Sequence, residues 1–292
     1  MSDESIAPAP KQAKESPKAG TPDVDPCATC VHAEHSPMFV PVLPPLNYPP
    51  VRQVSLFACL GWLKLGWQDM FRQPVSSFGY GLSLAVIGWV ILAITMDYPY
   101  LYTASVSGFA LVAPMLGAGL YEKSRRYLAG EPVSLFSTGA AWRRNSSALL
   151  GFSALCFLAG TLWQVISVFV IAVFYKGGGL KPMAMILEIL RSPEHNLIFA
   201  MYLFMGALFA AVMFALTVVS APMLVDRRNC RLQVGLVTSI NAVAENPIPL
   251  AIWATVIMIM VALGFATGLL LMIFVLPWLA HASFHAYRAL VE

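Results

Sequence analysis

The sequence predicts an all-α, polytopic membrane protein. Of its 292 residues 58% are apolar and only 11% are charged, and charges are absent from long intervals such as 148–174 and 197–225. A helix needs about 20 apolar residues to cross the hydrocarbon core of a bilayer, and both intervals are longer than that. Too little polar surface remains to cover such a core in water, so we expect membrane-spanning helices.

The first fifty residues differ from the rest in composition. Residues 1–50 are rich in Pro, Ala and Lys, and the first 26 contain no aromatic residue. Such a segment cannot bury enough apolar surface to offset its loss of conformational entropy. It also lacks the continuous apolar core of a secretory signal. We therefore expect a disordered cytosolic tail over 1–50 and a membrane domain over 51–292.

The apolar segments of the membrane domain predict the following spans: about 78–96, 101–121, 148–174, 197–221, 248–263 and 267–285. The last two come from one apolar block, 248–280, which would be roughly 50 Å long as a single helix. The hydrocarbon core is only about 30 Å thick. A turn near Gly264–Gly268 would divide this block into two spans.

An internal repeat favours that division. "APML" occurs at Ala113–Leu116 and at Ala221–Leu224, and "LPWL" at Leu276–Leu279 is similar. Each copy closes an apolar block and is followed by Arg or Lys. If the three exits face the same side, the spans form three helical hairpin repeats. Without the repeat, the last block is one tilted helix and the count is five.

Basic residues predict the orientation, because cytosolic loops carry an excess of Lys and Arg. Fifteen of the 18 basic residues lie on the side of the tail, and three lie on the other side: Lys176, Lys181 and Arg191. Both termini are therefore expected in the cytosol. With a net charge of only +3, binding of nucleic acid is not expected.

Two segments on the tail side, 54–72 and 232–245, are predicted to be amphipathic helices lying on the membrane. In the first, apolar residues recur at steps of three and four: Leu56, Leu60, Leu63, Trp67 and Met70. Polar residues take its other face: Lys64, Gln68, Asp69 and Arg72. Pro74 and Pro247 are expected to break the chain where it turns into the bilayer.

Ionisable side chains inside a membrane usually mark a pathway for ions or protons. No Asp, Glu, Lys, Arg or His lies near the middle of a predicted span, which argues against a proton pump or an ion-coupled carrier. The polar groups at depth are mild, such as Thr161, Gln164 and Thr217. They could line a passive path for a neutral solute, or join neighbouring helices.

Two groups of residues are candidate metal ligands. His281 and His285 share one helix face and could hold zinc or haem iron, or they could favour the carbonyl-rich end of the last helix. Cys27, Cys30, His32 and His35 form the compact pattern C-x2-C-x-H-x2-H, whereas structural zinc sites usually separate their ligand pairs. Incidental cysteines, weak metal capture and redox chemistry remain open for this tail. We predict no catalytic, cofactor or metal site.

Several segments resemble a known family: "GWLKLGWQDMFRQPVSSFGYGL", "VAPMLGAGLYEKSRRYLAGEPVSL", "SINAVAENPIPLAIWA" and "LPWLAHASFHAYRALV". The sequence is similar to a family of uncharacterised bacterial integral membrane proteins, defined only as a domain of unknown function, over roughly residues 55–290. Some members carry the label cytochrome c oxidase. The resemblance implies a multi-pass protein of the Gram-negative inner membrane and supplies no catalytic residues.

The oxidase label disagrees with the histidine content. A haem–copper catalytic subunit needs several histidines at membrane depth, and this chain has five in all, two of them in the tail. We therefore expect a non-enzymatic scaffold, assembly or regulatory factor for a membrane complex, with respiratory complexes as the candidates. Its partners would be the lipid bilayer and another membrane protein or a second copy. The alternatives are a passive channel or carrier, and a haem- or metal-binding redox accessory protein.

Overall fold

The computed structural model describes residues 48–98, 116–134, 139–174 and 196–292, together with Leu101, Tyr102, Ser105, Val106, Gly108 and Phe109. The chain divides into two units, 1–45 and 46–292, and every described residue belongs to the second. The predicted disordered tail lies outside the described residues, as do its candidate ligands Cys27, Cys30, His32 and His35.

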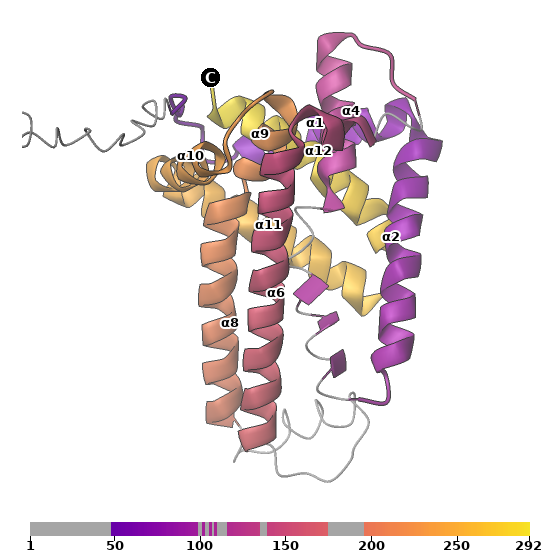
Figure 1. Cartoon of the computed structure of the whole chain (residues 1–292), viewed down its shortest axis with the longest axis vertical. Helices are drawn as coiled ribbons and strands as arrows, with labels where there is room; N and C mark the ends of the chain where they lie inside the picture. Colours follow the sequence, from indigo (N-terminus) through magenta and orange to yellow (C-terminus); the bar gives the residue numbers. More distant parts are fainter. Residues whose placement is uncertain are drawn as a thin grey trace, which may run out of the picture. The chain divides into compact units, whose positions relative to one another are not determined.

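The secondary-structure elements of the described residues are all helices, which confirms the all-α class (Figure 1). The helices are α1 (Ala58–Arg72), α2 (Pro74–Thr95), α4 (Ala118–Ala129), α5 (Ala140–Arg144), α6 (Ser146–Phe174), α8 (Asn196–Thr217), α9 (Ser220–Asp226), α10 (Leu232–Glu245), α11 (Pro247–Ala266) and α12 (Met272–Leu290). In this part of the chain the one extended pairing is an isolated bridge between Val51 and Val291.

Four helices in the described part of the chain are long and apolar enough to cross a membrane: Pro74–Thr95, Ser146–Val170, Phe199–Asp226 and Pro247–Ala266. They correspond to the predicted spans 78–96, 148–174, 197–221 and 248–263. The predicted span 101–121 is described only in part, because 103–104, 107 and 110–115 lie outside the described residues. The sixth predicted span is occupied by α12, which is not among the four because polar residues lower its hydropathy. A count of six spans therefore stays a prediction.

The apolar block 248–280 is divided into two helices, as the hairpin prediction requires. α11 ends at Ala266, and Gly268 and Leu269 turn the chain with φ of 61° and 70° before α12 begins at Met272. The turn extends beyond the predicted Gly268. α12 covers Met272–Leu290, whereas the predicted span was 267–285. This shift places His281 at the midpoint of its helix, whereas the sequence placed it near a helix end.

α12 is the central helix of the described residues, because it packs against α1, α2, α4, α9 and α11. Small residues allow these close approaches, as is common between membrane helices. A Cβ on Gly66 of α1 would lie 2.6 Å from the backbone nitrogen of Ala282. Gly81 of α2 lies against the carbonyl of Ile273, which Pro277 cannot pair because proline has no N–H.

Three corners of the chain have nearly the same backbone conformation. Gln73, Asn145 and Asn246 have φ of −138°, −151° and −132° and ψ of 76°, 57° and 54°. Each follows a short helix and precedes a long apolar one. Each side-chain amide donates to a carbonyl of a distant segment: Val133 for Gln73, Cys230 for Asn145 and Arg52 for Asn246. Two of the long helices begin at Pro74 and Pro247, as predicted.

The helices α1 and α10 form where the two amphipathic helices were predicted. On α1, Leu60 and Trp67 are exposed, as expected for a face that meets lipid. The prediction for Asp69 is wrong, because its side chain is buried together with Cys59, Trp62 and Gly66. α10 likewise buries small residues, namely Gly235, Thr238, Ser239 and Ala242. The inner face of α10 is formed by small residues, whereas that of α1 also contains the large side chains of Trp62 and Met70.

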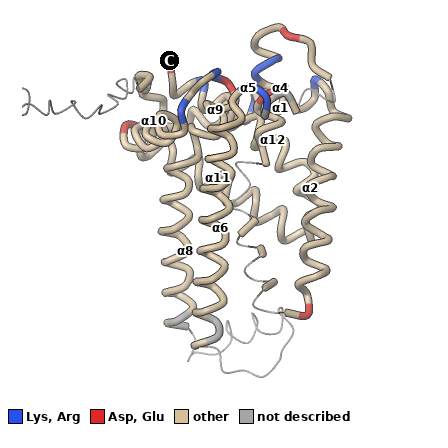
Figure 2. Tube along the Cα trace, viewed as in Figure 1, with Lys and Arg blue, Asp and Glu red and all other residues tan. Residues whose placement is uncertain are grey.

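Apart from Asp97, which follows α2 at the opposite end, the charged residues of the described part of the chain gather at one end of the long helices (Figure 2). The two ends of the folded unit also meet there. The backbone N–H of Arg52 donates to the carbonyl of Leu290 (2.8 Å), and the side chain of Arg52 pairs with Glu292 (3.0 Å). The segment that precedes α1 is thus fixed against the C-terminus.

Candidate functional site

Seven buried polar side chains lie between α1, α2, α4 and α12, and we call them the polar cluster. They are Asp69 of α1, Ser76 and Ser77 of α2, Lys123 and Ser124 of α4, and His281 and His285 of α12. Each is less than a tenth exposed, and Ser77, Lys123, Ser124 and His281 are completely buried. The four-residue spacing of the histidines sets both on the same side of α12.

Hydrogen bonds join five of these side chains in a single chain. Ser77 Oγ lies 3.3 Å from His281 Nε2, His281 Nδ1 lies 2.7 Å from Ser124 Oγ, and Ser124 Oγ lies 2.7 Å from Asp69 Oδ2. His285 Nε2 lies 2.8 Å from the same Asp69 oxygen. The chain therefore links all four helices and brings together residues as distant in sequence as Asp69 and His285.

The chemistry of the groups fixes the direction of these bonds. A carboxylate only accepts, so Ser124 gives its single hydroxyl proton to Asp69, and His285 donates from Nε2. His281 must then donate to Ser124 from Nδ1, and in the neutral form its Nε2 accepts from Ser77. This assigns the histidine tautomers by inference from the network. All donors in the chain point toward Asp69.

Asp69 is the common acceptor of the cluster. Besides Ser124 and His285, Arg72 approaches its second oxygen at 3.3 Å. Burial raises the pKa of Asp69, but the hydrogen bonds from His285 and Ser124, together with the electrostatic effect of the two histidines, outweigh burial, so the net pKa is below its usual range. Asp69 is thus held as a carboxylate.

Lys123 differs from Asp69, because its charge has no partner of opposite sign among the described residues. Its Nζ donates to Ser76 Oγ, and no carboxylate in this part of the chain forms an ion pair with it. Burial lowers the pKa of Lys123 to about 8. The cluster thus contains more basic than acidic groups.

The next residues of α4 form a separate group of paired charges. Glu122 is completely buried and accepts from Arg125 (2.9 Å) and Arg126 (2.8 Å). Arg125 also donates to Glu131, at 2.6 and 2.8 Å. These charges are compensated locally, so they stabilise the end of α4 and its following loop.

The structure brings the two predicted ligands of α12 into the cluster, but in different surroundings. Both ring nitrogens of His281 contact serine hydroxyls, and His285 Nε2 contacts Asp69. Among the residues that the structure describes, no three His, Cys, Asp or Glu side chains are arranged to hold a metal ion. A metal at His281 would have to displace Ser77 or Ser124.

The polar residues predicted at depth mostly bond to their own helices. The hydroxyls of Thr161 and Thr217 each donate to the carbonyl four residues earlier, those of Phe157 and Met213. Ser167 is different, because its hydroxyl meets that of Tyr202 on α8 at 2.9 Å. These two threonines are therefore engaged by backbone, whereas Ser167 joins two helices.

Sequence reasoning missed five members of the cluster: Asp69, Ser76, Ser77, Lys123 and Ser124. The available signal was Gly66, a glycine in the interior of a helix, which often marks a close approach of another backbone. Asp69 lies three residues after it and on the same face as Cys59 and Trp62. That signal indicates a buried face but does not reveal which helix covers it.

Comparison with known proteins gives one match. Residues 100–226, a little under half of the chain, match the model of a family described as "Predicted integral membrane protein (DUF2189)". No curated protein and no solved structure matches the chain. The matched stretch contains α4, α5, α6, α8 and α9 and therefore includes Lys123 and Ser124 of the polar cluster. Over that stretch the chain is similar to this family of predicted integral membrane proteins, in agreement with the resemblance seen in its sequence.

Proposed function

We propose that this integral membrane protein is a non-enzymatic scaffold, assembly or regulatory factor for a membrane complex. The observation that carries the proposal is that Asp69 and His281 of the polar cluster already have their hydrogen-bonding partners within the protein. Its carboxylate is saturated by Ser124, His285 and Arg72, and both nitrogens of His281 are engaged. Such a network is suited to fixing the relative positions of α1, α2, α4 and α12.

The outer surface of α1 offers a place for a partner. Phe57, Leu60, Leu65, Trp67 and Phe71 are all more than two-fifths exposed, although α1 is held firmly to α12 on its other side. The rings of Trp67 and Phe71 are in contact, with centroids 4.7 Å apart and planes tilted by 46°. A rigid helix that presents apolar and aromatic side chains at the charged end is suited to contact another membrane protein or a second copy.

The expected setting is the bacterial inner membrane, with both termini in the cytosol. The concentration of basic residues at one end of the long helices supports this orientation. Respiratory complexes are the first partners to examine, because some members of the family that the sequence resembles carry an oxidase label.

Purification in a mild detergent tests the proposal. We expect chemical cross-linking followed by mass spectrometry to recover a stoichiometric membrane partner or a homo-oligomer. The variant Leu60→Ala/Trp67→Ala should reduce its recovery, while Leu158→Ala/Leu162→Ala, on the exposed face of α6, should not. Recovery of a monomer without partners from cross-linked membranes would contradict the proposal.

Two further measurements identify the alternatives. Solute flux into liposomes that contain the purified protein would support a channel or carrier function in place of the scaffold function. A haem absorption band or stoichiometric metal in the purified protein would support a redox accessory function in place of the scaffold function. A colourless, metal-free protein without flux leaves the scaffold proposal in place.

A further inference from the structure

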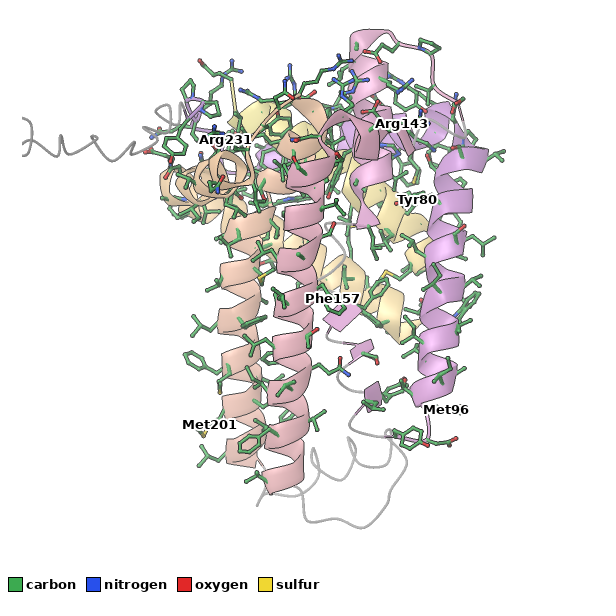
Figure 3. All side chains as sticks on the ribbon, viewed as in Figure 1. Tyr80, Met96, Arg143, Phe157, Met201 and Arg231 are labelled. Atoms are coloured by element: carbon green, nitrogen blue, oxygen red, sulfur yellow. The ribbon has the colours of Figure 1, made fainter. Side chains whose placement is uncertain are left out.

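Two hydrogen bonds join the first turns of α2 to α4 and to the residue that comes shortly before it. Lys123 of α4 is completely buried, and its Nζ is hydrogen-bonded to Ser76 Oγ. Tyr80, one turn further along α2 (Figure 3), donates from its hydroxyl to the carbonyl of Leu116. Of these groups Lys123 alone can carry a positive charge, so the contact between the two helices depends on the protonation of Nζ.

The surroundings of Nζ are poor for an ammonium group. An ammonium has three donors, and within the described residues Nζ has one hydrogen-bond partner, Ser76. Ser76 lies in the first turn of α2, which begins at Pro74, and the N-terminus of a helix carries a partial positive charge. A neutral amine can instead accept the hydroxyl proton of Ser76 and leaves no buried charge. The closed contact therefore favours the neutral form.

No free carboxylate on the surrounding helices compensates this charge. Asp69 is bound by Ser124, His285 and Arg72, Glu122 by Arg125 and Arg126, and Asp226 by Tyr287 and Arg288. The helices α1, α2, α4, α5, α9 and α12 contain no other Asp or Glu. Their further titratable groups are neutral or basic and include Tyr80, Tyr121, Tyr127, Arg143, Arg144 and His281.

The pKa of Lys123 agrees with this arrangement, because burial lowers it from 10.5 to about 8. The unfolded chain therefore binds this proton more tightly than the folded protein does. Below about pH 8 the full cost of the buried ammonium is present, and stability increases as the pH rises from about 8 toward 10.5. Asp69 responds in the acidic range, so the two effects can be measured separately.

From these contacts we propose that Lys123 is a pH-sensitive latch between α2 and α4. The neutral amine holds the two helices in contact, whereas the ammonium attracts water to Nζ and loosens α4. Because Ser124 follows directly in the chain, this loosening also reaches its hydrogen bonds with Asp69 and His281. The latch goes beyond the scaffold proposal and does not depend on it, since it concerns only contacts within this chain.

The test is hydrogen–deuterium exchange of the full-length protein in a neutral detergent at pH 7 and pH 9. Exchange rates are corrected for their intrinsic dependence on pH, and ionic strength is kept constant. We expect the protection of the α4 amides to increase about tenfold from pH 7 to pH 9, as follows from the folded and unfolded pKa values of Lys123. The amides of α6 should change less than twofold, because opening of α4 does not expose them.

Two variants change the latch in different ways. Lys123→Met removes the titrating group and should give α4 equal protection at the two pH values. Ser76→Asp places a carboxylate beside Nζ, keeps the ammonium charged and should also abolish the increase below pH 9. It decides the matter if Lys123→Met does not fold.

Lys64→Met is the matched control, because Lys64 is an exposed lysine of α1. This variant should retain the tenfold increase in protection. A native protein without the increase, or a Lys123→Met variant that retains it, would overturn the proposal. Equal responses of α4 and α6 would also overturn it, because the proton would then act on global stability and not on the contact between α2 and α4.

Discussion

The polar cluster and the pair of long helices α6 and α8 are held together in opposite ways. The cluster joins four helices by hydrogen bonds between completely or nearly completely buried side chains. α6 and α8 meet through aromatic rings. Trp163 lies 5.3 Å from Tyr202 and 5.6 Å from Phe209, centroid to centroid, and Gly206 leaves room for its ring.

This contrast shows where the specificity of the fold resides. Lipid tails are as apolar as leucine, so apolar contacts between membrane helices gain little from the hydrophobic effect. The outward residues of α6 and α8, such as Phe157, Leu158 and Phe204, can face lipid without choosing a neighbour. The cluster instead binds α1 to α12, two helices from opposite ends of the chain.

The largest effect is expected from removing the common acceptor of the cluster. Asp69→Asn replaces one acceptor oxygen by an NH2 donor that faces the donors Ser124 and His285, and it leaves Arg72 without its partner. Each buried donor left without its acceptor in this way costs about 1–3 kcal/mol of unfolding free energy. Unfolding by titration with sodium dodecyl sulfate measures it.

Asp97→Asn is the control for this variant, because Asp97 is exposed and follows α2 at the far end of that helix. Its unfolding free energy should change by less than about 0.5 kcal/mol. A cost below about 1 kcal/mol for Asp69→Asn would mean that the cluster does not hold the helices together.

Acid should weaken the same contact more mildly, because it removes the charge of Asp69 but keeps its shape. The pKa of Asp69 is lowered in the folded protein, so the unfolded chain binds the proton more tightly. The stability from this carboxylate is complete above its ordinary pKa, near 4, and is lost as the pH falls toward the folded pKa.

Melting temperatures between pH 6 and pH 3 measure this loss in the native protein and in Asp69→Asn. The native protein should lose more stability than the variant below about pH 4, since the variant has no carboxylate at this position. The comparison subtracts the titration of the other acids. Parallel curves would exclude a stabilising charge at Asp69.

A somewhat smaller effect is expected at the contact that lets α1 approach α12. Gly66→Ala would place a methyl group 2.6 Å from the backbone of Ala282, so the helices must separate. Overpacking of this kind costs about 1–3 kcal/mol. Gly61→Ala on the same helix meets nothing within 4 Å and should stabilise α1 by about 0.5–1 kcal/mol. Equal effects of the two substitutions on the melting temperature would contradict the close packing.

The helices were predictable because long apolar segments indicate membrane spans and proline indicates where a helix begins. The predicted span 148–174 and α6, Ser146–Phe174, differ by two residues at one end. The hairpin turn was predicted from the length of its block and the repeat. The backbone conformation shared by Gln73, Asn145 and Asn246 recurs before three of the long helices, although no sequence pattern revealed it.

The site was not predictable, for a physical reason. A charged residue on an amphipathic helix normally faces water, and this rule assigned Asp69 to the wrong face. Its burial depends on donors that arrive from Ser124 and His285, which are 55 and 216 residues away in sequence. Local periodicity contains no information on such pairings, because they exist only after α4 and α12 have packed.

The smallest predicted effect tests whether α6 and α8 contain any polar specificity of their own. Ser167→Ala removes the hydrogen bond to Tyr202, and Tyr202→Phe removes it from the other side. Such bonds between membrane helices contribute about 0.6 kcal/mol on average. A double-mutant cycle should therefore give a coupling of about 0.6 kcal/mol for this pair. Ser153, whose hydroxyl donates to Leu149 of its own helix, should show no coupling to Tyr202. A coupling several times larger at Ser167 would mean that the two helices depend on a polar contact as the cluster does, and the contrast between the two regions would fail.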